Sequence, residues 1–376
     1  MREESHLKST VISAFLVAMV LFSIVPSLAF GTSYRAIDLN PSGFNESEAY
    51  GISGTQQVGY GNVSATGGYG HALLWNGSAS SYVDLNPSGF DESCANGTNG
   101  TQQVGQGLSS AANSWWHALL WNGSADSFVD LNPSGFKISA AYGISGNQQV
   151  GVGGSGPATG NETHALLWSG SAESYIDLNP SGFSQSYASG TNGTQQVGCG
   201  SSSPASGVYH ALLWSGTAAS CVDLNPSGFS RSYACGVSSN QQVGYGWGSA
   251  TGGNAHALLW NGSASSYIDL NPNGFSLSYA YATNGTQQVG RGYINYDDIN
   301  ALLWNGSADS FVDLSQFLPA GLGSSGATAI DGYGNIVGYA KDSSGYSHAI
   351  LWEPVPEPAT LFLLGLGAVI LRKRKK

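Results

Sequence analysis

The stretch His71-Ala72-Leu73-Leu74-Trp75 decides the fold, because the chain repeats it at a nearly constant interval. The same five residues begin again at His117, His164, His210 and His256, and variants begin at Asn300 and His348. Successive starts lie 46, 47, 46, 46, 44 and 48 residues apart. A period of this length is typical of propeller blades or of helical arrays.

Four short strands are predicted in each unit. The second strand follows the QQVGxG pattern of Gln56 to Gly61, the third is the HALLW segment, and the fourth covers Ser81 to Leu85. The first strand surrounds an alanine that recurs in every unit: Ala49, Ala95, Ala141, Ala188, Ala234, Ala280 and Ala329. Asn76-Gly77 and Asn99-Gly100 are hairpin signals of the two-residue type. Because the apolar spacing of a helical array is missing, the units are predicted to be blades.

The position at which the repeat is cut predicts a closed ring. Tyr34 to Leu39 has the pattern of a fourth strand with no blade before it, and the last unit ends at Leu351-Trp352 without a fourth strand. Pairing these two ends would remove an exposed sheet edge. We therefore predict an all-β, seven-bladed β-propeller of four-stranded blades over residues 30–353, closed by the N-terminal strand pairing into the last blade. An open solenoid is the alternative.

Composition excludes several other classes of protein. Only 9% of the 376 residues are charged and 54 are glycine, which disfavours a long helical bundle, while 41% hydrophobic residues exclude a disordered chain. The body from residue 30 to 353 holds five basic and twenty acidic residues, a net charge of −15. Nucleic acid and anionic lipid are recognised by basic surfaces, so neither is expected as a partner.

The N-terminus has the pattern of an export signal. Arg2 and Lys8 precede an apolar run from Val11 to about Val25, and the small residues of Ser27-Leu28-Ala29 follow. This order predicts a secretory signal peptide over residues 1–29, cut after Ala29. An uncleaved membrane anchor is the alternative, although the apolar run is short for a span.

The C-terminus resembles the PEP-CTERM tail of bacterial exosortase substrates. Pro356-Glu357-Pro358 precedes an apolar segment from Ala359 to Leu371, and a basic run from Arg372 to Lys376 ends the chain. The resemblance covers residues 354–376 and implies an exosortase-type sorting machinery as partner. It also implies transient membrane anchoring by the tail, then processing and delivery to the cell envelope or the extracellular matrix. A simple hydrophobic tail anchor is the alternative.

The polar residues of the repeat have structural explanations as well as chemical ones. One histidine per blade places these side chains far apart, so a hydrogen-bonded structural role is favoured over a shared metal ion. The aspartate that begins each Asp-Leu-Asn-Pro segment invites a calcium interpretation, but capping of the following turn is favoured. Cys94, Cys199, Cys221 and Cys235 are expected to form no disulfide, because Cys199 and Cys221 fall on strands two positions apart. No metal, cofactor or catalytic residue is predicted.

The repeat itself resembles the HAF-type extracellular repeat, with leucine in place of the phenylalanine that gives that repeat its name. The resemblance covers nearly all of residues 33 to 353 and implies an exported repeat protein. A non-enzymatic binding or structural propeller with a glycan or protein ligand is the favoured function. An extracellular polysaccharide hydrolase or lyase is the alternative, with Tyr296-Asp297-Asp298 as the concentrated break in the pattern. An ice-binding surface protein is a weaker one.

The loop between the second and third strands is predicted to carry the binding face. This loop is the most variable part of each unit, and it is repeatedly aromatic. Aromatic rings stack on the apolar faces of sugars, so we expect a multivalent glycan-binding rim, with rings that merely cover the blade ends as the alternative. The candidate ligand-binding residues are Tyr69, Trp115, Trp116, Tyr209, Trp247, Tyr293 and Tyr296.

Overall fold

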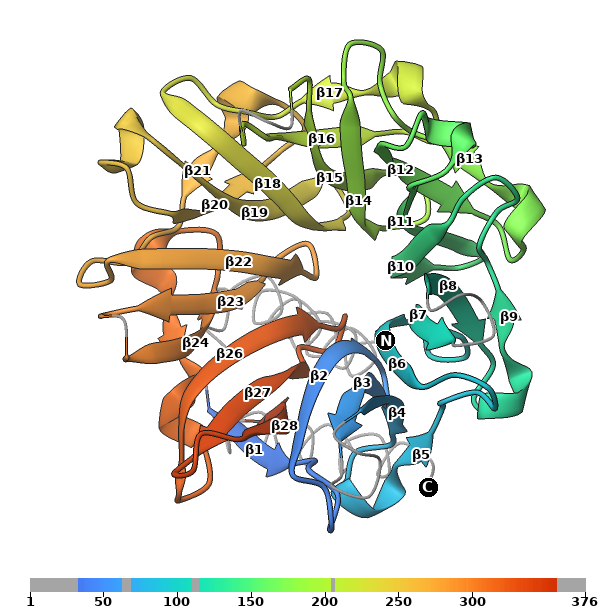
Figure 1. Cartoon of the computed structure of the whole chain (residues 1–376). Helices are drawn as coiled ribbons and strands as arrows, with labels where there is room; N and C mark the ends of the chain where they lie inside the picture. Colours follow the sequence, from blue (N-terminus) through green and yellow to red (C-terminus); the bar gives the residue numbers. More distant parts are fainter. Residues whose placement is uncertain (1–32, 63–68, 110–114, 204–206, 296, 357–376) are drawn as a thin grey trace, which may run out of the picture. The chain divides into compact units, whose positions relative to one another are not determined.

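The computed structural model describes residues 33–62, 69–109, 115–203, 207–295 and 297–356. Tyr34–Glu353 form one compact unit. Seven four-stranded sheets surround a centre in this unit, with the first strand of each innermost (Figure 1). The predicted seven-bladed propeller is therefore confirmed. The predicted signal peptide over residues 1–29 and most of the tail, residues 357–376, lie outside the described residues.

The strands of the first four blades follow one pattern. Blade 1 contains β2 (Glu46–Ser53), β3 (Gln56–Asn62), β4 (Gly70–Trp75) and β5 (Val83–Asp84). Blade 2 contains β6 (Glu92–Thr98), β7 (Gln103–Ser109), β8 (Trp115–Trp121) and β9 (Val129–Asp130). Blade 3 contains β10 (Ile138–Ser145), β11 (Gln148–Gly154), β12 (Thr163–Trp168) and β13 (Ile176–Asp177). Blade 4 contains β14 (Gln185–Thr191), β15 (Gln196–Ser201), β16 (His210–Trp214) and β17 (Val222–Asp223).

The remaining blades continue this pattern, and the last one also receives the N-terminal strand. Blade 5 contains β18 (Phe229–Ser238), β19 (Gln241–Gly248), β20 (His256–Trp260) and β21 (Ile268–Asp269). Blade 6 contains β22 (Leu277–Thr283), β23 (Gln288–Tyr293), β24 (Ile299–Trp304) and β25 (Val312–Asp313). Blade 7 contains β26 (Leu322–Ile330), β27 (Ile336–Asp342), β28 (Ser347–Pro354) and β1 (Tyr34–Asp38).

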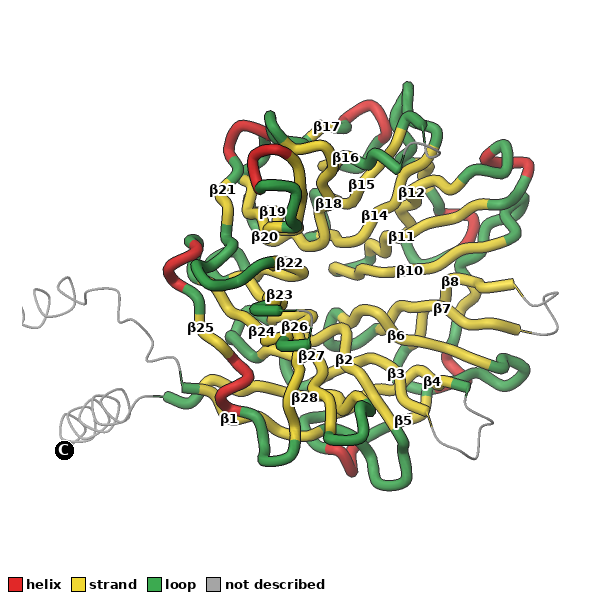
Figure 2. Tube along the Cα trace, turned by 60° about the vertical axis from the view of Figure 1, so that its left-hand side comes forward, coloured by secondary structure: helices red, strands yellow, loops and turns green. Residues whose placement is uncertain are grey.

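Short 3-10 helices connect some of these strands, and Figure 2 shows them in red at the margin of the ring. Six precede the fourth strands: η2 (Ala79–Ser81), η4 (Ala125–Ser127), η6 (Ala172–Ser174), η8 (Ala218–Ser220), η10 (Ala264–Ser266) and η11 (Ala308–Ser310). Among the described residues, three more lie in other connections: η5 (Pro157–Thr159), η9 (Ser249–Thr251) and η12 (Leu314–Phe317). The last lies between blades 6 and 7, where the NPSGF segment of the other linkers is replaced.

The ring closes through the N-terminal strand, as predicted. The strand order of the last sheet is β1-β28-β27-β26, so β1 supplies its outermost strand. The Leu39 amide donates to the Ala349 carbonyl at 2.8 Å, and Arg35 forms an ion pair with Glu353 at 2.7 Å. Because β1 comes from the start of the chain and β28 from its end, the two ends of the unit hold each other in place.

The fourth strands are shorter than predicted. In blade 1 only Val83 and Asp84 pair with the third strand, whereas the prediction began at Ser81. Ser81 belongs to the 3-10 helix η2, and its hydroxyl accepts a hydrogen bond from the Asn76 amide at 2.8 Å. Asn76-Gly77 is therefore not a two-residue hairpin. The side chain of Ser81 instead holds a seven-residue connection between β4 and β5.

The turns between first and second strands alternate around the ring. Blades 1, 3 and 5 use two-residue turns, such as the one between Ser53 and Gln56. Blades 2, 4 and 6 use four-residue turns, so Asn99-Gly100 lies in a turn but not in a two-residue hairpin. The first asparagine of each longer turn donates to a carbonyl in the next blade's turn: Asn99 to Gly146, Asn192 to Ser239 and Asn284 to Asp331. Blade 7 has a five-residue turn of its own.

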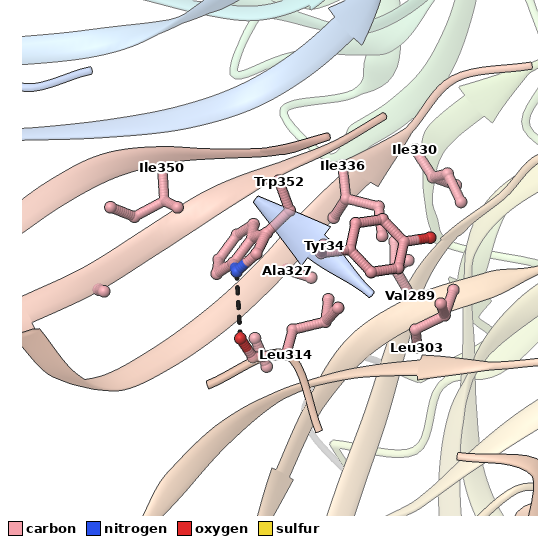
Figure 3. Close-up of a cluster of buried hydrophobic side chains, with 11 residues drawn as sticks. Tyr34, Val289, Leu303, Leu314, Ala327, Ile330, Ile336, Ile350 and Trp352 are labelled. Atoms are coloured by element: carbon pink, nitrogen blue, oxygen red, sulfur yellow. Dashed lines mark hydrogen bonds between the residues drawn. The ribbon is translucent and has the colours of Figure 1, made fainter. Parts of the chain in front are cut away.

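The hydrophobic core is divided into clusters that lie between neighbouring blades. In the third strand of blade 1, Leu73 and Trp75 pack toward blade 7, while Ala72 and Leu74 pack toward blade 2. Burial of both strand faces agrees with the prediction and explains the apolar HALLW pattern. Figure 3 shows the cluster in which the Trp352 indole donates to the Leu314 carbonyl at 3.1 Å. The corresponding indole nitrogen of the other six blades has no hydrogen-bond partner in the described parts of the chain.

Two glycines of the repeat permit close backbone contacts, one within a blade and one between blades. A β-carbon on Gly59 would overlap the Glu48 carbonyl of the same blade, so this glycine permits close pairing within the blade and not between blades. A β-carbon on Gly51 would lie 2.9 Å from the α-carbon of Gly97, so the first strands of adjacent blades touch there. The prediction of Ala329 as the core alanine of blade 7 was wrong. Ala327 occupies that position, because it pairs with a glycine in the same way that Ala49 pairs with Gly59 in blade 1.

Candidate binding face

The loops of the propeller collect at two ends of the ring. The loops between second and third strands share one end with the linkers between blades, as the bond from Ser109 Oγ to the Gly89 carbonyl at 2.9 Å shows. We call this the linker end. The turns between first and second strands lie at the opposite end, the turn end. The predicted rim is at the linker end.

Adjacent blades are joined by a serine that the sequence interpretation did not single out. Ser93 Oγ accepts from the Ala72 amide of the preceding blade at 2.9 Å and donates to Asn86 Oδ1 at 2.6 Å. The same serine recurs in every blade: Ser47, Ser93, Ser139, Ser186, Ser232, Ser278 and Ser325. The sequence could have revealed this serine, because it recurs two residues before each core alanine. These positions are fixed by packing and are not free to bind a ligand.

The histidines of the repeat are structural, as predicted. In blade 2, His117 Nδ1 lies 2.7 Å from Asp130 Oδ2 on the neighbouring fourth strand. Five other blades contain the same pair at 2.7 or 2.8 Å. Blade 6 has asparagine instead, and Asn300 Nδ2 donates to Asp313 Oδ2 at 2.7 Å. Within the described ranges, no three His, Cys, Asp or Glu side chains are grouped as a metal site requires.

The aspartates also cap turns, as predicted. Asp84 Oδ1 accepts from the Asn86 amide at 2.8 Å, while Asp84 Oδ2 faces His71 at 2.8 Å. Each carboxylate is therefore occupied on both oxygens by protein groups. This arrangement explains the aspartate without calcium.

At the linker end, the first two strands carry cross-strand pairs that differ from blade to blade. We call them the variable pairs. Nearest the core alanine they are Glu48–Tyr60, Cys94–Gln106, Ala140–Val152, Tyr187–Cys199, Tyr233–Tyr245, Tyr279–Arg291 and Gly326–Tyr339. One step closer to the linkers, blades 1–6 have Glu46–Asn62, Glu92–Leu108, Ile138–Gly154, Gln185–Ser201, Arg231–Trp247 and Leu277–Tyr293. The variable pairs alternate with constant Ser–Gly and Ala–Gly pairs in these blades, so variation is confined to one face.

In blades 4 to 6 the variable pairs and their neighbours form a continuous aromatic belt. We define the belt as Tyr187, Tyr209, Tyr233, Tyr245, Trp247, Tyr279, Tyr281 and Tyr293. Ring centroids are 5.8 Å apart for Tyr209–Tyr233 and 4.8 Å apart for Tyr245–Tyr279, so the contacts cross from blade to blade. All eight side chains are half-buried. Burial raises the pKa of Tyr187 to about 12, so its hydroxyl is neutral at physiological pH.

Two arginines contact the belt. The guanidinium of Arg231 lies 5.5 Å from the centre of the Trp247 ring. The guanidinium of Arg291 lies 5.4 to 5.6 Å from the rings of Tyr279, Tyr281 and Tyr293. Both distances are within the range of cation–π attraction. The belt therefore combines flat aromatic surfaces with positive charge.

The structure brings together three of the seven predicted binding residues. Tyr209, Trp247 and Tyr293 belong to the belt, and Trp247 also lines a cavity of about 580 Å³ with Phe229. Tyr69 and Trp115 are exposed on blades 1 and 2, away from it. Trp116 is half-buried next to Trp115, and Tyr296 lies outside the described residues. Of the described residues, the candidate rings that contact one another in a continuous series lie in blades 4 to 6.

The belt also contains residues that the sequence interpretation missed. Tyr233, Tyr245 and Tyr279 lie on first and second strands, not in the loops that the prediction emphasised. The available signal was the difference between otherwise similar units at these positions. The greater variability of the loops concealed this difference in the sequence. Only the strand register shows that these residues share a face.

Other parts of the chain offer different chemistry. Asp297 and Asp298 line a cavity of about 370 Å³ with Asn300, where blade 6 departs from the repeat. A second cavity, of about 600 Å³, lies at the turn end and is lined by polar residues such as Asn192 and Asn284. The four cysteines are free thiols, and burial raises the pKa of Cys94 and of Cys235 to about 12, so neither is a nucleophile at neutral pH.

Comparison with models of protein families finds a match at the C-terminus of the chain. Residues 354–375 match the model of the PEP-CTERM protein-sorting motif. The tail is a sorting signal. A tail of this kind indicates an exosortase-processed protein of the cell surface that the tail anchors transiently in the membrane. Among the described residues, no helix has the length and apolar character needed to cross a bilayer.

Solved structures of low sequence identity share the propeller fold. The β-propeller domain of the Trilobed protease from Pyrococcus furiosus, described as having an open velcro topology, matches with a TM-score of 0.54 and 8% identity over 82% of this chain and 97% of its own. A Mycobacterium tuberculosis puromycin-hydrolyzing peptidase matches with a TM-score of 0.56 and 12% identity over 84% of this chain. This chain spans about half of the peptidase, 52% of its length. No curated protein sequence matches the chain.

Proposed function

We propose that this chain is an exported surface or matrix protein whose propeller binds glycan without enzymatic activity. A signal peptide over residues 1–29 directs export, and the exosortase-type machinery processes the tail. The body is a HAF-type extracellular repeat domain. The aromatic belt is the observation that carries this proposal, because it places a continuous series of contacting rings at the linker end of blades 4 to 6.

The composition of the belt supports a ligand and not random surface variation. Among the described residues, exposed aromatic side chains elsewhere, such as Trp115 and Tyr333, are not joined to others in a series of ring contacts as the belt residues are. A half-buried series of tyrosines with a tryptophan is expensive to leave in contact with water, and such a patch marks an interaction site. Sugar rings have apolar faces that stack on Trp247 and Tyr245, and the tyrosine hydroxyls supply hydrogen bonds to sugar hydroxyl groups.

An extracellular polysaccharide hydrolase is the second candidate. Asp297 and Asp298 line a cavity in the blade that departs most from the repeat, and paired carboxylates are the usual catalytic groups of glycosidases. The two residues are adjacent in sequence and both are exposed, whereas the general acid of a glycosidase commonly lies in an apolar, buried environment. Binding without catalysis is therefore the favoured function.

Affinity electrophoresis of the full chain in gels containing exopolysaccharide from the producing organism tests the proposal. Trp247→Ala should weaken retention roughly tenfold, since a stacked tryptophan commonly dominates such a site, while Trp247→Phe should keep much of it. Tyr333→Ala is the matched control, because Tyr333 is 80% exposed at the turn end. Equal retention of Trp247→Ala and the unchanged chain would contradict the proposal. Release of reducing sugar that Asp297→Ala abolishes would favour the hydrolase.

A further inference from the structure

Arg291 is a half-buried cation without a carboxylate partner. It lies on β23, and its Nη1 donates to the Tyr339 hydroxyl at 2.8 Å. Its Nε is buried and has no acceptor among the residues described, and no ion pair to Arg291 is found there. Burying a charge is costly unless an opposite charge and hydrogen bonds compensate it. The protein supplies only part of that compensation.

Positive charge is gathered in the same sector of the linker end. Of the five basic residues of the body, Arg231, Arg291 and Lys341 occupy variable positions of blades 5, 6 and 7. Arg35 is instead paired with Glu353 on the closing strand. The described variable positions hold three carboxylates, Glu46, Glu48 and Glu92, all on blades 1 and 2. Among the variable pairs, arginine therefore occurs in blades 5 and 6, and carboxylates occur in blades 1 and 2.

The aromatic rings around Arg291 form a cage that determines which sign of charge a ligand can have. Rings of Tyr279, Tyr281 and Tyr293 surround the guanidinium at 5.4 to 5.6 Å, in the way that aromatic cages surround a bound cation. Here the protein's own arginine already fills the cage. A cationic ligand has no place there, whereas the half-buried guanidinium can attract an anionic group. Arginine is well suited to a planar carboxylate, which it can bind through two parallel hydrogen bonds.

The acidic side chains nearest in sequence do not fill this role. Asp297 and Asp298 follow Tyr293 on the same loop, but they line the cavity on the side of Leu318 and Leu322. Neither carboxylate reaches ion-pair distance of Arg291. No carboxylate of the described residues therefore compensates the charge of Arg291.

We propose that blades 5 to 7 form a binding site for acidic polysaccharide, in which Arg291 and Arg231 contact the carboxylates of uronic acid units. Trp247 and Tyr245 stack on the apolar faces of the same sugars. This inference rests on the proposed glycan-binding function and adds the charge class of the ligand and the sector that holds it. In place of the predicted multivalent rim, this inference assigns one composite site to blades 5 to 7.

Two polymers that differ only in charge test the inference. Polygalacturonate and its methyl-esterified form have the same sugar backbone, and titration of the full chain with each gives two dissociation constants. The unchanged chain should bind polygalacturonate at least about tenfold more tightly, and salt should reduce this preference. Arg291→Met, which keeps the side-chain volume, should remove the preference while binding to the methyl ester persists. Arg35→Ala, a cation outside the belt, should change neither constant.

Each outcome distinguishes the two proposals. Equal binding of both polymers, or a preference that survives Arg291→Met, overturns the acidic-ligand inference and leaves glycan binding intact. Binding of poly-glutamate as tight as that of polygalacturonate also overturns it, because charge alone would then suffice. Absence of binding to either polymer and to the exopolysaccharide overturns both proposals. If Arg291→Met lowers the melting temperature, Arg231→Ala carries the same test, since Arg231 contacts the surface of Trp247.

Discussion

The histidine of each third strand and the aspartate of the following fourth strand are hydrogen-bonded in six blades, 13 residues apart in the five formed within one stretch of chain. Blade 6 reaches the same geometry with an amide, because Asn300 Nδ2 occupies the place of the imidazole nitrogen opposite Asp313. The sequence predicted the structural role of this histidine correctly, because a residue repeated in six of seven units is expected to be fixed by packing. The serine bridge between blades was missed because serine is common everywhere in this chain.

The substitution found in blade 6 predicts the effect of the same change in blade 2. His117→Asn should change the free energy of unfolding by less than about 0.5 kcal/mol, because the amide can donate to Asp130. His117→Ala should cost about 1 kcal/mol, the usual value of a lost hydrogen bond. Urea denaturation of both variants measures the difference. Equal losses for the two would show that the imidazole ring, and not its hydrogen bond, stabilises the blade.

The strand β1 shows which elements the sequence could predict. Its place was evident from the phase of the repeat, because Tyr34 to Leu39 lacks a preceding blade. The short fourth strands were not predictable in the same way. A segment such as Ser81 to Leu85 has strand-like composition, but Ser81 is used to hold the turn after Trp75, which leaves two residues for pairing. Local hydrogen bonds of serine compete with strand pairing, and sequence patterns do not show which will prevail.

Removal of β1 should destabilise the closed ring. Deleting residues 34–38 exposes β28 as a sheet edge and removes the buried Tyr34 ring from the blade 7 core. We expect aggregation or a loss of several kcal/mol in unfolding free energy, well above the roughly 0.5 kcal/mol of surface changes. Arg35→Ala is the control, because it removes an exposed ion pair and keeps the strand. A truncated chain that melts like the intact one would show that closure does not depend on β1.

The ring as a whole followed from periodicity, whereas the position of its binding sector did not. Seven similar units predict a symmetric molecule, and symmetry suggested a rim of equivalent sites. The structure shows instead that strand register pairs Arg231 with Trp247 in blade 5 and Tyr279 with Arg291 in blade 6. The contact of Tyr245 with Tyr279 connects the two blades. A sequence comparison of units identifies which residues differ, but only the pairing of strands shows that the differing residues share one face.

Sorting of the whole molecule depends on its tail. Replacing Pro356-Glu357-Pro358 by alanines should block processing and retain the chain in the membrane fraction, because the sorting motif over residues 354–375 would no longer be read. Tyr333→Ala, a change of an exposed residue outside the motif, should leave processing unchanged. Fractionation and mass analysis of the released chain measure both. Release of the triple variant at the normal rate would show that the hydrophobic segment alone determines its fate.

The alternation of the turns has a consequence for how such a ring evolves. Each four-residue turn donates an asparagine amide to the two- or five-residue turn that follows, so blades work in pairs: Asn99 with blade 3, Asn192 with blade 5 and Asn284 with blade 7. Unequal crossing-over that inserted one blade would place two turns of the same length in neighbouring blades. Insertion of two would preserve every contact. Genes of this kind should therefore lengthen or shorten by about 92 codons at a time, and an odd ring should carry one irregular junction, where its ends meet.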